Sequence, residues 1–167
     1  MRRPGFAQVH YDSATRTASV VKLTNVPNKK APAGVVGGKP HGQILDEIYE
    51  ATFAYMADMN IALAVKESSF ARFSRETEAI NKAHGIIEYV LWHYRDMSPQ
   101  ELAATHIKKV ITNKGTATKE DVEAALEKFV GKIYYECDDE SDAVAIAIAW
   151  LLDNGYIDNP YNQEDNA

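Results

Sequence analysis

Acidic residues crowd the start of "CDDESDAVAIAIAWLL", residues 137–152, and the stretch then becomes almost entirely apolar. If this stretch is a helix, Asp139 and Asp142 are three residues apart and project from the same face. Carboxylates paired in this way can bind a metal ion. The residues expected to continue as an adjacent buried stripe are Ala143, Ile146, Ala147 and Trp150.

Helix capping is a simpler explanation for the same acidic residues. The dipole and the free backbone amides at the start of a helix favour negative charge, so acids in a first turn need no ligand. Asp138 and Glu140 point away from the Asp139 face, and we expect both to be solvated. The helix alone leaves capping and metal binding open.

A third carboxylate, Glu67, favours the metal site. It ends "IALAVKE", residues 61–67, a nearly all-apolar run that predicts a strand buried on both faces. The carboxyl edge of an α/β sheet is where functional sites gather. Three carboxylates in a partly dry cleft cannot all be ionised without a cation, and hard oxygen ligands with few imidazoles favour Mg²⁺ or Mn²⁺ over Zn²⁺.

The elements that must position these residues alternate along the chain. Alternating apolar and polar residues predict a hairpin, helical spacing predicts three long helices, and a Ser or Thr cap opens two of them. The arrangement predicts an α/β domain with helices packed on a mixed sheet. The predicted hairpin strands are 6–11 and 17–23, and the predicted helices before residue 137 are 43–59, 74–95 and 118–130.

Composition limits the class of protein. The 167 residues, 46% hydrophobic and 25% charged, are typical of one globular domain, which we place at residues 1–155, with a flexible acidic tail at 156–167. Cys137 is the only cysteine, so no intrachain disulfide can form.

The N-terminus lacks a secretory leader and the longest apolar run is too short for a bilayer, which predicts a cytoplasmic protein without membrane contact. A net charge of −6 argues against a nucleic-acid binder, although a metal-binding carboxylate cluster also adds negative charge.

Four segments carry a family resemblance, in order along most of the chain: "VKESSFARF", "NKAHGIIEY", "THIKKVITNKGTATKEDVEAAL" and "DESDAVAIAIAWLL". Together they resemble the RuvC-type Holliday junction resolvases, which are members of the ribonuclease H-like fold. The resemblance implies a ribonuclease H-like mixed sheet flanked by helices. It also implies a single RuvC-like nuclease domain that resolves Holliday junctions or other branched DNA by metal-dependent phosphodiester hydrolysis.

The resemblance also implies roles for individual residues. Glu67, Asp139 and Asp142 would be catalytic, as three of four acidic ligands of Mg²⁺, with Mn²⁺ able to substitute. Such a two-metal site activates a water and stabilises the leaving oxygen. The residues that would contact DNA, by aromatic stacking or by offsetting phosphate charge, are Phe70, Arg72, Lys108, Lys109 and Lys119.

One part of the family pattern is expected to be missing. Family members open with an apolar strand ending in Gly-Ile-Asp, followed several residues later by a Gly-aromatic pair. Gly5 and Phe6 match that pair, but only four residues precede them. The alternative function is therefore a catalytically impaired junction-binding protein, and a plain α/β interaction domain with a capped acidic helix also stays open.

The long helix at 74–95 bears on assembly. Its apolar residues Ile86, Ile87, Val90, Leu91 and Tyr94 exceed what one packing face requires. Two sites that act on opposed strands of four-way junction DNA need a homodimer, which these residues could form. A thick core helix would explain the same pattern.

Overall fold

A computed structural model describes residues 4–26, 40–57, 59–68 and 75–161. These residues form two compact units. Unit 1 comprises Met1–Pro4, Asn25–Ala64 and Ser69–Gln100, and unit 2 comprises Gly5–Thr24, Val65–Ser68 and Glu101–Ala167. The prediction of one nuclease domain over residues 1–155 stays a prediction.

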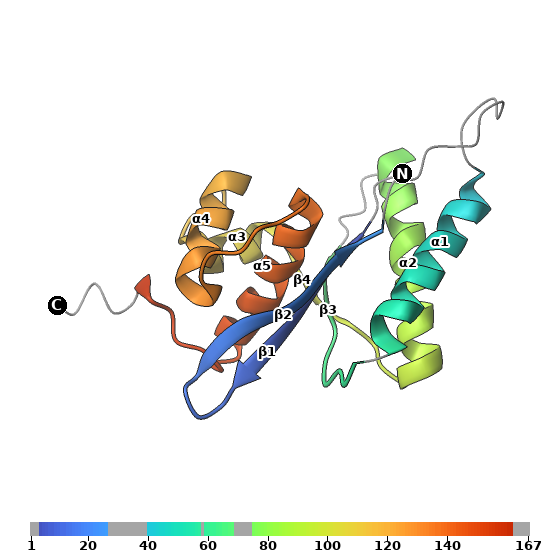
Figure 1. Cartoon of the computed structure of the whole chain (residues 1–167). Coiled ribbons are helices and arrows are strands. Elements are labelled where there is room, and N and C mark those ends of the chain that lie inside the picture. Colours follow the sequence, from blue (N-terminus) through green and yellow to red (C-terminus); the bar gives the residue numbers. More distant parts are fainter. Residues whose placement is uncertain (1–3, 27–39, 58, 69–74, 162–167) are drawn as a thin grey trace. The chain divides into compact units, whose positions relative to one another are not determined.

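Unit 1 is built on two helices, α1 (His41–Ala57) and α2 (Arg75–Arg95), which lie side by side (Figure 1). Met56, Val90 and Leu91 form a buried apolar cluster within it. The Arg95 guanidinium donates to the carbonyls of Met56 and Met59 at 2.6 and 3.0 Å, so a cation bonds carbonyls in the last turn of α1 and just beyond it. Both predicted helices are confirmed; the predicted Ser74 cap lies outside the described residues.

Unit 2 opens with the predicted hairpin, β1 (Gly5–Asp12) and β2 (Thr17–Asn25). The Asp12 carboxylate accepts from the Ala14 amide at 2.8 Å, and Arg16 takes a left-handed φ of 54°, so the turn is stabilised locally. A second two-stranded sheet pairs β3 (Val65–Glu67) with β4 (Gln100–Leu102). Its bonds run from the Gln100 amide to the Ala64 carbonyl and from the Ser68 amide to the Leu102 carbonyl, a parallel arrangement.

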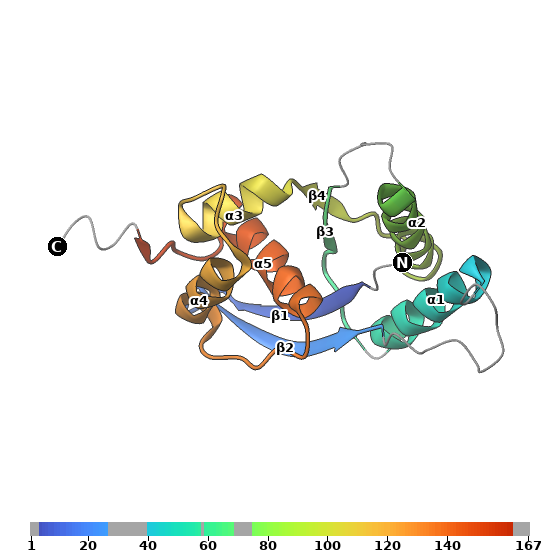
Figure 2. The same cartoon turned by 90° about the horizontal axis from the view of Figure 1, so that it is seen from above.

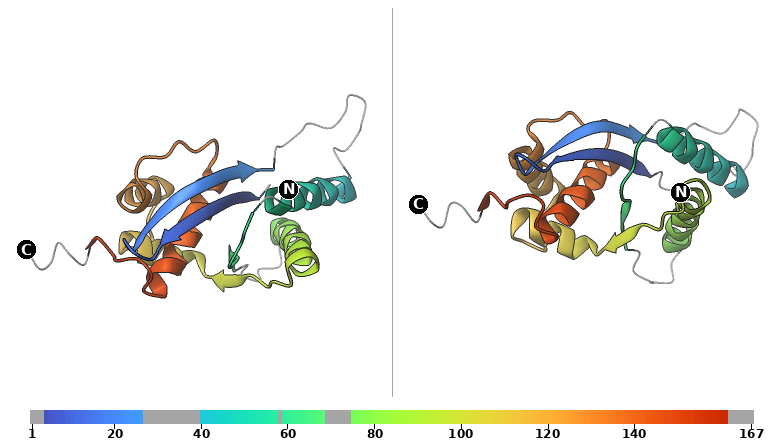
Figure 3. Two further views of the ribbon diagram at one scale, coloured as in Figure 1. Left: turned by 60° about the horizontal axis from the view of Figure 1, so that its bottom comes forward. Right: turned by 90° about the horizontal axis from the view of Figure 1, so that it is seen from below.

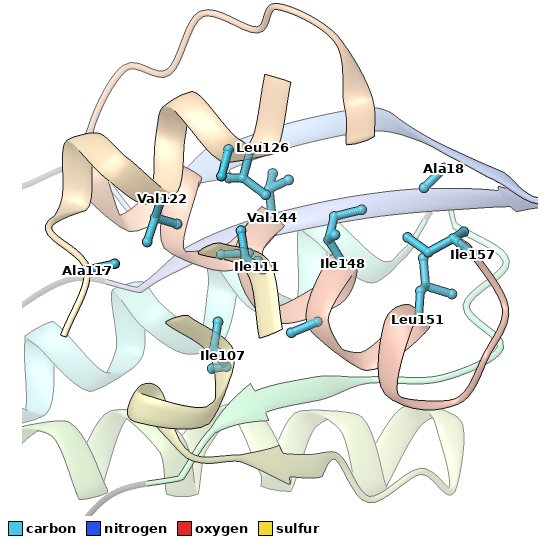
Figure 4. Packing of buried hydrophobic residues seen from close by; sticks show 13 residues of the cluster. Ala18, Ile107, Ile111, Ala117, Val122, Leu126, Val144, Ile148, Leu151 and Ile157 are labelled. Carbon is cyan, nitrogen blue, oxygen red and sulfur yellow. The ribbon is translucent and has the colours of Figure 1, made fainter. Parts of the chain in front are cut away.

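Three helices complete unit 2: α3 (Ala104–Thr112), α4 (Lys119–Val130) and α5 (Asp138–Asp153). Helix α5 runs alongside the β1–β2 hairpin (Figure 2), and the turned views show the same pairing (Figure 3). It also packs against α3, α4 and β3, so most of its circumference is covered. Figure 4 shows the resulting core, in which Ile111, Leu126, Val144 and Ile148 are fully buried.

The buried face of α5 differs from the predicted stripe. Ser141, Val144, Ala145, Ile148 and Ala149 are buried, whereas the predicted stripe is only partly buried throughout. That stripe comprised Ala143, Ile146, Ala147 and Trp150. Apolar residues occupy nearly every position after Asp142, so the pattern could not select a face, and the packing of the neighbouring elements selected it instead.

The chain after α5 folds back onto unit 2. Arg16 donates to the Gly155 carbonyl at 3.0 Å and pairs with the Asp158 carboxylate at 2.7 Å. Ile157 is buried, and Tyr156 contacts both Tyr11 and Trp150 through its ring. The predicted flexible tail began at residue 156, but residues 156–161 pack on unit 2; residues 162–167 lie outside the described part of the chain.

Within the described ranges, no helix is both long enough and apolar enough to cross a membrane.

Candidate active site at the start of α5

The start of α5 carries the predicted acids, with Asp139 in the first turn and Asp142 just after it. The cap residue is Cys137, whose side chain makes no capping hydrogen bond. Instead, the Glu140 carboxylate reaches back and accepts the Glu136 amide at 2.8 Å. Glu140 therefore ties the helix start to the preceding chain, and Asp142 has a different partner.

The prediction that Glu140 is solvated is wrong, because its side chain is buried at 3% exposure. Close packing around the start of α5 explains this. A Cβ added at Gly5 in β1 would lie 2.2 Å from the Asp139 carbonyl oxygen, so only glycine permits this approach. The start of β1 thus packs closely against the backbone of Asp139 and Glu140, while Asp138 stays exposed as expected.

The partner of Asp142 is Lys119, the first residue of α4. The Lys119 ammonium lies 3.1 Å from the Asp138 carboxylate and 3.4 Å from that of Asp142. Partial burial lowers the pKa of Lys119, but the hydrogen bond to Asp138 and the two negative charges outweigh it and raise the pKa above its ordinary value. Lys119 is therefore a fixed positive charge next to the acidic turn.

A capping box sets the place of Lys119 in α4. The Thr118 hydroxyl accepts from the Asp121 amide at 3.2 Å, and the Asp121 carboxylate accepts from the Thr118 amide at 3.0 Å. These bonds satisfy two free amides at the start of α4 and confirm the predicted Thr118 cap. They also lower the pKa of Asp121, chiefly through the backbone hydrogen bond of Thr118.

The adjacent lysines of α3, Lys108 and Lys109, lie in different environments. Lys108 is half-buried and donates to the Ala117 carbonyl at 2.8 Å. Lys109 is exposed and lines a shallow cavity of about 290 Å³ at the far end of α5. There the imidazole of His106 lies 2.7 Å from the Asp153 carboxylate. The structure thus places Lys108 near α4, and Lys109 away from the acidic turn.

Glu67 ends β3 as predicted and is exposed. The strand before it is shorter than expected: β3 begins at Val65, whereas the predicted strand began at residue 61. Unit 2 holds Glu67, Asp139 and Asp142 together, because α5 packs against β3. Within residues 4–26, 40–57, 59–68 and 75–161, however, no three His, Cys, Asp or Glu side chains come close enough to hold a metal ion.

The remaining predicted DNA contacts, Phe70 and Arg72, lie outside the described residues. Sequence reasoning missed the pairing of Lys119 with Asp138 and the burial of Glu140. Local spacing gave no signal for either, because the Lys119–Asp138 pair joins two separate helices and the burial of Glu140 depends on elements packed around the start of α5.

Comparisons with known proteins give the family. The family model "Crossover junction endodeoxyribonuclease RuvC" matches residues 36–150, which is more than half of the chain. No curated protein sequence matches at the significance required.

Solved structures support the same assignment. A Thermus thermophilus RuvC structure matches with a TM-score of 0.73 at 16% identity, covering 91% of this chain and 90% of that one. T. thermophilus RuvC in complex with a Holliday junction substrate matches with a TM-score of 0.72 at 18% identity, covering 87% and 84%. These similarities confirm the predicted ribonuclease H-like α/β fold, and with the family match they show that this chain belongs to the RuvC family of crossover junction endodeoxyribonucleases.

Proposed function

We propose that this chain is a structure-selective endonuclease that resolves four-way DNA junctions by phosphodiester hydrolysis. The observation that carries the proposal is the match of residues 36–150 to the RuvC family model. The nucleases of this family are metal-dependent. The acidic first turn of α5 and the lysine beside it lie inside the matched region. A cation facing carboxylates at an accessible helix end is consistent with a site that handles phosphate.

Within this proposal, Glu67, Asp139 and Asp142 are the catalytic acids and Mg²⁺ is the ion they bind, with Mn²⁺ as a substitute. The donor chemistry supports this, because carboxylate oxygens suit hard divalent cations. The arrangement of these side chains does not fit a bound metal ion, since no three such ligands come together in the described residues. We therefore assign no reaction step to the ion.

The chain's own cations have clearer roles. Lys119 already faces Asp138 and Asp142, so its ammonium can offset phosphate charge beside the acidic turn. Lys109 is exposed and can contact a more distant part of the DNA backbone. Phe70 and Arg72 remain proposed DNA contacts by family resemblance.

A second candidate is a junction-binding protein with impaired catalysis. Two observations favour it. The described residues hold no cluster of three metal ligands, and the Lys119 ammonium already pairs with Asp142, one of the three proposed ligands. In this case junction DNA would bind without being cut.

We also propose that the protein acts as a homodimer through α2. This helix exposes large aromatic side chains: Tyr89, Trp92 and Tyr94 are 53%, 59% and 43% exposed. Aromatic residues of this kind are enriched at protein interfaces. Pairing two copies would supply two sites for the two opposed strands of a junction.

The test is a gel assay on a labelled four-way junction and on a linear duplex of the same sequence, with Mg²⁺ or with chelator. Metal-dependent cutting of the junction alone supports the endonuclease. A shifted but uncut junction in Mg²⁺ supports the impaired binder, and neither effect would overturn both. Glu67→Gln and Asp142→Asn should abolish cutting, whereas the control Glu127→Gln, on the exposed side of α4, should not.

A further inference from the structure

We propose that Lys108 is a positioning residue for Lys119 and not itself a phosphate contact. The proposal deepens the proposed junction binding, on which its DNA arm rests. It divides two lysines to which the family resemblance gives the same role. The distinction comes from where each ammonium group is directed in the folded chain.

The Lys108 ammonium points inward. It is half-buried and donates to the carbonyl of Ala117, a residue that is 3% exposed. The Ala117 amide in turn donates to the Lys114 carbonyl at 3.1 Å. Lys108 therefore stabilises the end of the loop between α3 and α4, and one of the three donors of its ammonium group is already used there.

A second side chain of α3, that of Thr112, also forms hydrogen bonds with the loop between α3 and α4. The Thr112 hydroxyl donates to the Lys108 carbonyl at 2.8 Å and lies 3.0 Å from the Lys114 carbonyl oxygen. The residues joined in this way are the last turn of α3 and the connection 113–117. Two side chains of α3 therefore bond this connection and help to fix the backbone just before α4.

Lys119 lies two residues after the hydrogen bond between Lys108 and Ala117. Ala117 is bonded by Lys108, Thr118 is the cap of α4, and Lys119 is the next residue. Its ammonium is then directed to Asp138 and Asp142 of α5. Lys108 thus acts on the position of Lys119 through two residues of backbone.

Positioning matters because lysine is flexible. Immobilising one such side chain on binding costs about 0.5 to 1.5 kcal/mol, which corresponds to roughly a two- to tenfold change in affinity. An anchored backbone and a defined ammonium position reduce that cost. Losing the Lys108 bond should therefore weaken the contribution of Lys119 without removing a phosphate contact of its own.

A double-mutant cycle in junction affinity tests this. Lys119→Met should reduce the slope of log K against log salt by about 0.9, the value for one phosphate contact. Lys108→Met should weaken binding by about two- to tenfold in the parent, and should have no effect in the Lys119→Met background. The double variant should therefore lose one contact in the slope, not two.

Other outcomes would overturn the proposal. A double variant that loses about 1.8 units of slope would show that Lys108 contacts phosphate itself. An effect of Lys108→Met that is equal in both backgrounds would show a general structural role. Lys108→Arg, which keeps a donor, should restore affinity, and Lys132→Met, an exposed lysine of unit 2, is the charge-matched control.

A second measurement does not depend on DNA. Hydrogen exchange at the amides of residues 117–121 should become faster in Lys108→Met and stay unchanged in Lys132→Met. Unchanged exchange in Lys108→Met would refute the anchoring of α4 by Lys108. If the parent binds no junction, the proposed function fails, and the exchange result still decides whether Lys108 positions the start of α4.

Discussion

Glu140 should stabilise the fold although sequence patterns place it among solvated acids. The residue is 3% exposed, and its carboxylate accepts the Glu136 amide at 2.8 Å. A hydrogen bond to a charged group contributes about 1.5 to 3 kcal/mol, and a negative charge in the first turn of a helix adds about 0.3 to 1 kcal/mol. Glu140→Ala should therefore lower the free energy of unfolding by about 3 kcal/mol.

A paired variant separates the charge from the hydrogen bond. Glu140→Gln keeps an acceptor oxygen but loses the charge, so its cost should be about 1 kcal/mol. For a chain of this size, these losses correspond to decreases in melting temperature of roughly 6 to 12 °C and 2 to 4 °C. Glu127→Gln on the exposed side of α4 is the control, for which no measurable change is expected.

The assay is urea unfolding followed by the fluorescence of Trp150, which lies on α5. The chain has two tryptophans, and Trp92 is exposed, so a Trp92→Phe background leaves Trp150 as the only reporter. Equal midpoints for Glu140→Ala and the parent would refute the reasoning, because a buried carboxylate that bonds a backbone amide cannot be removed without cost.

Three further predictions concern local interactions. Arg16 lowers the pKa of Asp158 below its ordinary value of 3.8 through a hydrogen bond, so this pairing stabilises the docked C-terminal segment above that pH and loses its effect as the pH falls through the lowered pKa. Trp150 fluorescence should report this release through its stacking on Tyr156, and Asp158→Asn should show no such acid transition. Thr118→Ala should destabilise the protein by about 1 kcal/mol in urea unfolding, and Thr118→Ser by much less, because serine can still cap α4. Ile148→Ala should cost about 2 to 5 kcal/mol and Ile146→Ala clearly less; a larger effect at Ile146 would contradict the observed buried face of α5.

Local patterns were sufficient where the cause is local. The hairpin follows from alternation on both sides of a polar turn, and Asp12 bonds a residue only two positions away. The start of α4 follows from Thr118 and Asp121, which are three residues apart and bond each other. Helix α3 was not predicted, although Ile107, Val110 and Ile111 have helical spacing that could have indicated it.

The candidate site was only partly accessible to the same reasoning. The spacing of Asp139 and Asp142 predicted a shared face at the start of α5, and the apolar run at 61–67 predicted Glu67 at the end of a strand. The structure places all three in one compact unit, and their metal binding stays a prediction. Their arrangement depends on how β3 and α5 pack, and three-residue spacing carries no information about that.

The sequence by itself determined the family, the order of most elements and the location of the acidic turn, because these depend on periodicity, caps and motifs within short windows. Only the tertiary structure decided which face of α5 is buried, that Glu140 is enclosed, and that Lys119 faces Asp138 and Asp142. It also separated Lys108 from Lys109, which are chemically equivalent in sequence. The physical reason is common to all four: burial and pairing depend on neighbours that are distant along the chain, and a side chain acquires them only when the elements pack.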